Sequence, residues 1–228
     1  MPEKSNATAQ VSSESCEIRR RPAHLQAYLK LRTSILYGDL TPGEAVTIQG
    51  LVQNTGAGIT PVREAIRRLT SEGALEFLGN RRVVVPTLSI ETVNELTFLR
   101  ETIEPKLASL AANDPNPEKI EWLNALDFNL DTAIQRGDIP AYLRYNHAFH
   151  ETLYAMAKSP MLNHVANTLW LRFGPSMRIV CGRLGTQNLA DNHKSALAGL
   201  RSRDATATAN AIRQDVLQGM DQLRAALL

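Results

Sequence analysis

The chain has 228 residues, enough for one large or two small domains that each bury a hydrophobic core. Hydrophobic residues make up 43% and charged residues 21% of it, the composition of an ordinary soluble globular protein, and no stretch resembles a transmembrane segment. The formal net charge of +2 is too small to indicate a partner by itself, so the distribution of charge along the chain is more informative.

The composition of residues 1–22 predicts a disordered tail. They are polar and rich in serine and lack the apolar stretch of a secretion signal, so we expect a cytoplasmic protein. Cys16 lies in this tail and Cys181 lies in a predicted helical region. Because this spacing fits neither a metal site nor a disulfide framework, both cysteines are predicted to be free thiols.

Residues 23–56 predict two helices separated by a turn. Apolar residues recur at helical spacing from Leu25 to Leu36, and the glycines and proline of residues 38–43 then end the first helix. Thr47 can cap a short second helix that we expect to end at residues 54–56.

Residues 56–71 predict the turn and second helix of a helix-turn-helix. Pro61 suits the first helical position, and Thr60 before it can cap the helix. One face is apolar (Val62, Ala65, Ile66, Leu69), and the opposite face carries Thr60, Arg63, Glu64, Arg67 and Thr70. Arginine near the N-terminal end of such a helix can bind guanine or phosphate in DNA. The alternative is an ordinary surface helix with solvated arginines.

A β-wing is predicted after this helix. Residues 74–77 and 82–85 have the composition of two short strands, and the turn between them brings Arg81 and Arg82 to the tip. Residues 17–90 hold ten Lys and Arg against six Asp and Glu, whereas residues 91–228 hold fourteen against fifteen. The excess of positive charge in the first half favours phosphate contact there.

Residues 25–88 resemble the winged helix-turn-helix of the GntR family of bacterial transcription regulators. The resemblance is carried by Gly38, Leu40, Pro42, Gly43, Thr60-Pro61-Val62-Arg63-Glu64-Ala65, Leu69, Glu72-Gly73 and Asn80-Arg81. It implies that Arg63 is a principal DNA contact, and the candidate DNA-binding set is Thr60, Arg63, Arg67, Arg81 and Arg82. Two positions depart from the family pattern: Gly58-Ile59-Thr60 replaces Ser-Arg-Thr, and Arg82 replaces the usual wing glycine.

The rest of the chain has helical periodicity and no convincing strand. Ser89 can cap a long helix that ends at residues 113–117, and helices follow at about 118–137, 139–158, 161–184, 187–202 and from 204 to the C-terminus. The predicted fold is therefore mainly α. A winged helix-turn-helix domain spans residues 23–88, and an all-helical bundle for effector binding and dimerisation spans residues 89–228.

Residues 90–225 resemble the FCD ligand-binding domain of the FadR subfamily. The matching residues are Arg100, Glu104, Asn146-His147-Ala148-Phe149-His150-Glu151, Leu153, His193, Leu197, Arg203-Asp204-Ala205 and Ala209. Many such domains hold a divalent metal, and its ligand positions fall here on Asn146, His150, His193 and Asp215. Asn146 replaces the family's commonest aspartate and Asp215 replaces its last histidine, but the set could still hold Zn²⁺, Ni²⁺ or Mn²⁺. The alternative is a pair of hydrogen-bonded core histidines without metal. The other three histidines, His24, His147 and His164, are predicted to be structural or exposed.

An effector pocket is expected beside these ligands. The resemblance implies that Arg100 points into the domain, and Arg172 and Arg178 follow the aromatic Trp170 in the sequence. A small organic acid is therefore the predicted effector. The alternative is that Arg100 only pairs with Glu101 or Glu104. The predicted function is a homodimeric transcription regulator that binds an inverted repeat in double-stranded DNA and has no membrane partner. Two other hypotheses are a metal-dependent hydrolase and a ligand-binding protein that no longer binds DNA.

Overall fold

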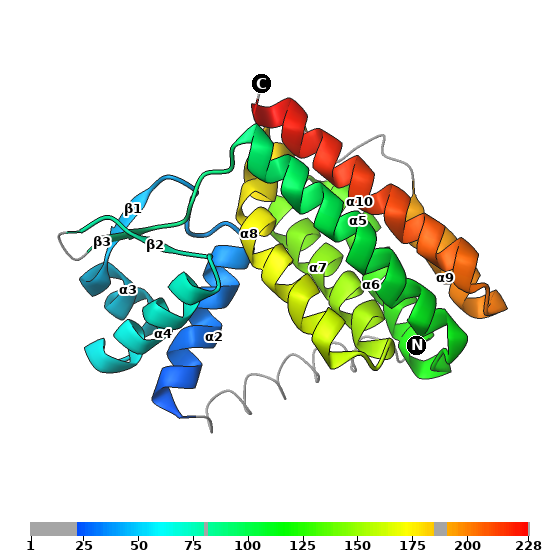
Figure 1. The fold of residues 1–228 in the computed structure, drawn as a ribbon, viewed down its shortest axis with the longest axis horizontal. Helices are drawn as coiled ribbons and strands as arrows, with labels where there is room; N and C mark the ends of the chain where they lie inside the picture. Colours follow the sequence, from blue (N-terminus) through cyan, green and yellow to red (C-terminus); the bar gives the residue numbers. More distant parts are fainter. Residues whose placement is uncertain (1–21, 80–81, 185–190, 228) are drawn as a thin grey trace. The chain divides into compact units, whose positions relative to one another are not determined.

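The computed structural model describes residues 22–79, 82–184 and 191–227, so the expected tail lies almost wholly outside the described residues (Figure 1). The described chain forms two compact units. One contains the chain up to Ile35 together with Gly43–Pro86, and the other contains Leu36–Pro42 together with the chain from Thr87 onward. None of the described helices is both long enough and apolar enough to cross a membrane.

The described residues of the first unit form three helices and a small antiparallel sheet. The helices are α2 (Ala23–Leu36), α3 (Ile48–Thr55) and α4 (Ile59–Ser71), and the strands are β1 (Ala45–Thr47), β2 (Glu76–Phe77) and β3 (Arg82–Val84), in the order β1-β3-β2. Its core consists of fully or almost fully buried apolar side chains, including Leu31, Ile35, Leu51, Val62, Ile66, Leu69, Leu75 and Val83. This is the predicted winged helix-turn-helix arrangement, in which β2 and β3 form the wing.

The start of α4 differs from the sequence prediction. The helix begins at Ile59, and Gly58 is its N-cap residue without a side-chain cap, so the expected capping by Thr60 is wrong. Pro61 therefore occupies the third helical position. Its missing N–H still costs no helical hydrogen bond, because the first N–H groups of a helix have no partner within it.

The short strands also differ in detail from the prediction. Strand β1 was not expected, and it pairs Ala45 with Val84 at one edge of the sheet. The first wing strand contains only Glu76 and Phe77, because Ala74 and Leu75 are buried where the chain leaves α4. The Ala74 amide donates to the Leu69 carbonyl and so closes the helix end.

Within its described residues, the second unit contains six helices. They are α5 (Ile90–Asn113), α6 (Pro117–Arg136), α7 (Ile139–Met156), α8 (Pro160–Leu184), α9 (Asn192–Ser202) and α10 (Ala205–Leu227). The side chains of Ser89, Asn116, Asp138 and Asp191 accept hydrogen bonds from the first-turn amides of four of them. Helix α10 packs along α5, as Figure 1 shows, and also against α9, while α7 packs against α6, α5 and α8. The predicted start of α9 near residue 187 lies outside the described residues.

Candidate functional site

Three helices of the second unit, α7, α9 and α10, bring polar side chains into its interior. His150 projects from the buried face of α7, with Asn146 and Tyr154 one turn before and after it. His193 comes from α9 and Asp215 from α10. His150 and His193 are 1% and 6% exposed, so these groups must satisfy one another or a ligand because water reaches them poorly.

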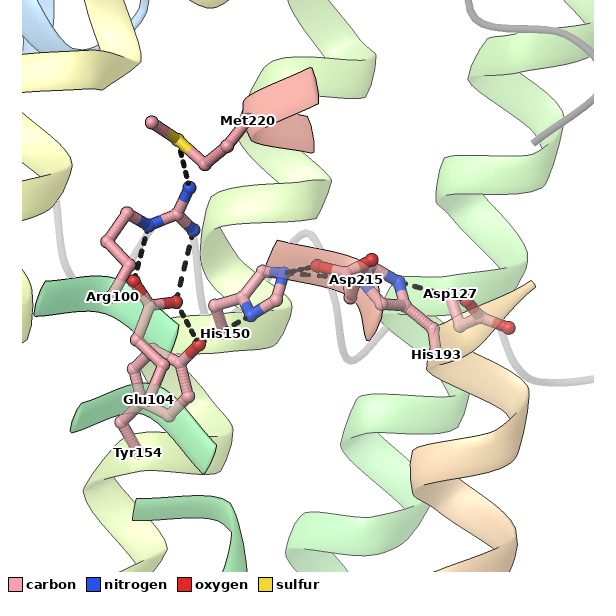
Figure 2. A network of polar contacts seen from close by, with 8 residues as sticks. All are labelled: Arg100, Glu104, Asp127, His150, Tyr154, His193, Asp215 and Met220. Carbon is pink, nitrogen blue, oxygen red and sulfur yellow. Dashed lines mark hydrogen bonds and ion pairs between the residues drawn. The ribbon is translucent and has the colours of Figure 1, made fainter. Parts of the chain in front are cut away.

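Three of the four predicted metal ligands converge. His150 Nε2 lies 3.1 Å from Asp215 Oδ2 and 3.3 Å from His193 Nε2, and His193 Nε2 lies 3.7 Å from Asp215 Oδ1 (Figure 2). Ligand atoms about 2.0 to 2.1 Å from one tetrahedral ion lie roughly 3.3 Å apart. The three donors therefore have the chemistry and spacing of a metal site. Asn146 lines the adjoining pocket with His150 and Asp215.

Outer partners surround both histidines. Asp127 Oδ1 of α6 lies 3.3 Å from His193 Nδ1, and the Tyr154 hydroxyl lies 2.8 Å from His150 Nδ1. The Phe149 ring stacks on His193 at 3.9 Å between ring centroids, which fixes the plane of the imidazole. Sequence reasoning missed Asp127 and Tyr154. The four-residue step from His150 to Tyr154 is a sequence signal, whereas nothing in the sequence links Asp127 to His193.

The electrostatics of the cluster favour charge on its members. Burial by itself raises the pKa of the Asp215 carboxyl, but the hydrogen bond with His150 and nearby positive charges outweigh burial and lower this pKa to about 2. Burial lowers the pKa of the His193 imidazole, but the hydrogen bond to Asp127 and the charge of Asp215 outweigh it and raise that pKa. The site therefore stabilises a carboxylate and attracts positive charge.

Arg100 is the only predicted effector residue at the pocket. The residue is 3% exposed. Its guanidinium pairs with Glu104 through Nε at 2.5 Å and Nη2 at 3.1 Å, while Nη1 faces the Met220 sulfur at 3.3 Å. It also lies 3.6 Å from the centroid of the Phe173 ring. Arg172 is exposed and does not line this pocket, so the geometry of the pocket gives no support to its predicted role as an effector ligand. Its position on α8 directs it away from the interior.

The pocket itself is narrow. It has a volume of about 30 Å³, room for about two water molecules. Arg100, Asn146, His150, Trp170 and Asp215 line it, together with Tyr142, Phe173, Met177, Gln218, Gly219 and Gln222. Trp170 is one of these lining residues, and its buried N–H has no acceptor among the described residues.

The remaining histidines lie outside the cluster. His147 is buried, with its ring against Tyr37 and Trp170 at centroid distances of 5.9 and 5.0 Å. His24 and His164 are exposed. All three positions agree with the prediction that these residues are structural or at the surface. Cys181 is a buried free thiol, and Cys16 lies outside the described residues.

The candidate DNA-binding residues lie on the surface of the first unit. Thr60, Arg63 and Arg67 are exposed on α4, opposite its buried apolar face, and Arg82 is exposed at the start of β3. Arg81 lies outside the described residues. The geometry leaves the described members of this set accessible to a large partner, as a DNA-binding face requires.

Two family descriptions match this chain. "Bacterial regulatory proteins, gntR family" matches residues 23–85, and "FCD domain" matches residues 95–218, more than half of the sequence. The chain belongs to the GntR family of bacterial regulators and carries an FCD domain.

Relatives of this GntR protein agree with the assignment. It is 28% identical over 183 residues to the HTH-type transcriptional regulator McbR of Escherichia coli strain K12, covering 79% of this chain and 83% of McbR. The solved structure of E. coli McbR/YncC has a TM-score of 0.85 at 25% identity, covering 91% of this chain and all of that one. A transcriptional regulator from Rhodococcus sp. RHA1 shares the fold, with a TM-score of 0.72 at 16% identity over 89% of this chain and 97% of its own. The GntR protein is therefore a DNA-binding transcription regulator with a C-terminal effector-binding domain.

Proposed function

We propose that this GntR protein is a cytoplasmic, homodimeric regulator of the FadR subfamily whose affinity for an inverted-repeat operator depends on a small organic acid bound beside a divalent metal. The carrying observation is the convergence of His150, His193 and Asp215 next to a pocket that contains Arg100. A dimer is favoured because one recognition helix and one wing offer too few contacts for tight operator binding. Its relatives are named as transcriptional regulators, which favours regulation over metal-dependent hydrolysis.

The donor set supports a metal of the Zn²⁺, Ni²⁺ or Mn²⁺ type. His150, His193 and Asp215 supply two imidazole nitrogens and a carboxylate within 4.8 Å of one another, and Asn146 offers an amide oxygen from the pocket wall. When bound, the metal supplies a positive centre to which an acid ligand can coordinate. The protein's own residues hold and orient that centre.

The pocket chemistry supports an acid effector. Arg100 Nη1 contacts the weak acceptor sulfur of Met220, and the Trp170 N–H has no acceptor among the described side chains. A carboxylate has the oxygen acceptors that both donors lack. Because the pocket has room for little more than water, an acid must displace its lining side chains, and this displacement gives the ligand a means of favouring one conformation.

The decisive experiment measures whether acid binding and operator binding depend on each other. A panel of small carboxylic and hydroxycarboxylic acids is screened by thermal shift, and the affinity of each hit is measured with and without promoter DNA. We expect the acid to change operator affinity, and the operator to change acid affinity, by the same factor of roughly 5 to 150, the usual size of allosteric coupling. Trp170→Phe, which keeps an aromatic ring but removes the N–H, should weaken acid binding about tenfold.

Arg172→Ala serves as the matched control, because it removes an exposed arginine from the same helix as Trp170. It should leave acid affinity unchanged. An acid that binds equally well with and without operator would show that this pocket does not control DNA binding. No binding by any acid would remove this class of effector.

A further inference from the structure

A buried hydrogen-bonded chain determines which ring nitrogen of His150 carries a proton (Figure 2). Glu104 is fully buried and accepts two hydrogen bonds from Arg100, so it is an ionised carboxylate that can only accept. The Tyr154 hydroxyl lies 2.5 Å from Glu104 Oε2 and has a single hydrogen, which it donates there. Its oxygen is then left to accept from His150 Nδ1 at 2.8 Å. His150 Nδ1 therefore carries a proton, and in the neutral ring this is the only one; Nε2 donates to Asp215 only in the imidazolium form.

Asp127 determines in the same way which ring nitrogen of His193 carries a proton. Its carboxylate is 4% exposed and its Oδ1 lies 3.3 Å from His193 Nδ1. A carboxylate accepts and does not donate, so His193 Nδ1 carries the hydrogen of this contact. Stacking on Phe149 holds the ring in the orientation that this hydrogen bond needs.

The consequence is that the neutral forms of both rings direct an Nε2 lone pair at the same point. The two Nε2 atoms lie 3.3 Å apart, and oxygens of Asp215 lie 3.1 and 3.7 Å from them. Three electron-rich atoms this close repel one another unless a proton or a metal cation lies among them. Second partners of this kind orient ligating histidines in metal sites and raise their basicity.

We propose that Asp127 and Tyr154 are positioning residues that fix both histidines as Nδ1–H tautomers and so present their Nε2 atoms, with Asp215, to a divalent cation. The inference rests on the proposed function, because it assumes that a metal is the ligand of His150 and His193. It adds that Arg100 acts on the metal site as well as on the pocket, because the Arg100–Glu104 pair holds the Tyr154 hydroxyl.

The first test measures Zn²⁺ affinity in the full-length, chelator-treated protein by competition with a chromophoric chelator. Asp127→Asn and Tyr154→Phe should each weaken Zn²⁺ binding by about 10- to 100-fold, the usual effect of losing such a partner. An asparagine amide can present either oxygen or nitrogen to His193, so it no longer dictates the tautomer. Phenylalanine keeps the packing of Tyr154 but cannot accept from His150. Circular dichroism checks that both variants are folded.

Matched controls lie on the same two helices. Asp131→Asn changes the same residue type one turn from Asp127, where the carboxylate pairs with Lys194 at 2.8 Å. Tyr145→Phe removes a hydroxyl from α7 outside this chain of contacts. Both controls should stay within about twofold of wild type. If Asp127→Asn and Tyr154→Phe also bind Zn²⁺ like wild type, the positioning role is overturned.

The second test separates this inference from the metal proposal. Nitrogen-15 NMR of histidine-labelled, metal-free protein reports the tautomer directly. Nδ1–H signals for His150 and His193, lost from His150 in Tyr154→Phe and from His193 in Asp127→Asn, support the positioning role. Nε2–H signals in neutral wild-type rings overturn it. If wild type and His150→Ala bind Zn²⁺ equally weakly while the wild-type rings are Nδ1–H, the metal proposal fails and the positioning role is retained.

Discussion

The environment of each arginine in this chain determines its role. Arg63 is exposed on α4 and accessible to DNA, whereas Arg68, five residues further on, lies 3.8 Å from the centroid of the Tyr28 ring and bonds Glu72 at 3.0 Å. Arg100 is buried in a bidentate pair. Residue type alone does not separate these roles, because the same guanidinium binds phosphate, carboxylate or an aromatic ring.

At this scale, Arg63→Ala should weaken operator binding by about 1 to 3 kcal/mol without changing the fold, because an exposed side chain is removed and no core contact is lost. A mobility-shift titration on the protein's own promoter, together with circular dichroism, measures both effects. Arg172→Ala removes an exposed arginine of the other unit and should leave the titration unchanged. Equal affinity of Arg63→Ala and wild type would remove Arg63 from the DNA-binding set.

Among the elements, helix α8 does more than line the pocket. Trp170, Phe173 and Met177 line the pocket from it, and the segment Leu36–Pro42 packs against it at Pro175 and Arg178. Arg178 Nη1 bonds Asp39 Oδ1 at 2.8 Å, so Arg178 holds this segment and is not at the pocket, contrary to the sequence prediction.

Gly38→Ala tests how closely the segment must approach α8. Gly38 has a φ of +70°, and an added Cβ would lie 2.8 Å from Arg178 Cβ, so the substitution combines backbone strain with a steric clash. It should lower the free energy of unfolding in urea by about 1 to 3 kcal/mol. Gly182→Ala, where an added Cβ meets nothing within 4 Å, should instead be neutral or slightly stabilising. A stable Gly38→Ala protein would mean that the segment can move away from α8.

For the whole molecule, stability depends on a buried polar cluster as well as on apolar packing. Asp127, Asp215 and Glu104 are carboxylates inside the helical unit, and each lies against a histidine, an arginine or both. Removing one partner of such a group leaves a buried charge uncompensated. The cluster should therefore make the folding stability of the protein depend on pH and on metal.

As the pH is lowered from about 6 to 3, the free energy of unfolding should fall more steeply in wild type than in Asp215→Asn. Urea unfolding in the presence of a chelator measures both. The pKa of Asp215 is lowered from 3.8 to about 2. A group whose pKa is lower in the folded state than in the unfolded state stabilises the fold, here by about 2 kcal/mol, at pH values above the unfolded-state pKa. This stabilisation is lost as the pH falls towards the folded-state pKa. Asp221→Asn, at an exposed aspartate, should keep the wild-type slope. Parallel curves for wild type and Asp215→Asn would contradict this linkage.

The sequence by itself determined the local structure of this protein. Helical periodicity and turn residues predicted α2 to α10 and the wing, and the four-residue step from Asn146 to His150 placed both on one face of a helix. Strand β1 was missed because it has only three residues, too few to show the alternation of apolar and polar side chains that identifies a strand. The assignment of His193 and Asp215 to the same site came from family resemblance.

Only the tertiary structure decided which of these faces meet. It brought Asp127 of α6 to His193 of α9 and directed Arg172 outward from α8, and the spacing of residues predicts neither. The physical reason is that periodicity fixes a side chain only relative to its own helix axis. The rotation and depth of that helix in the bundle depend on packing against all its neighbours at once.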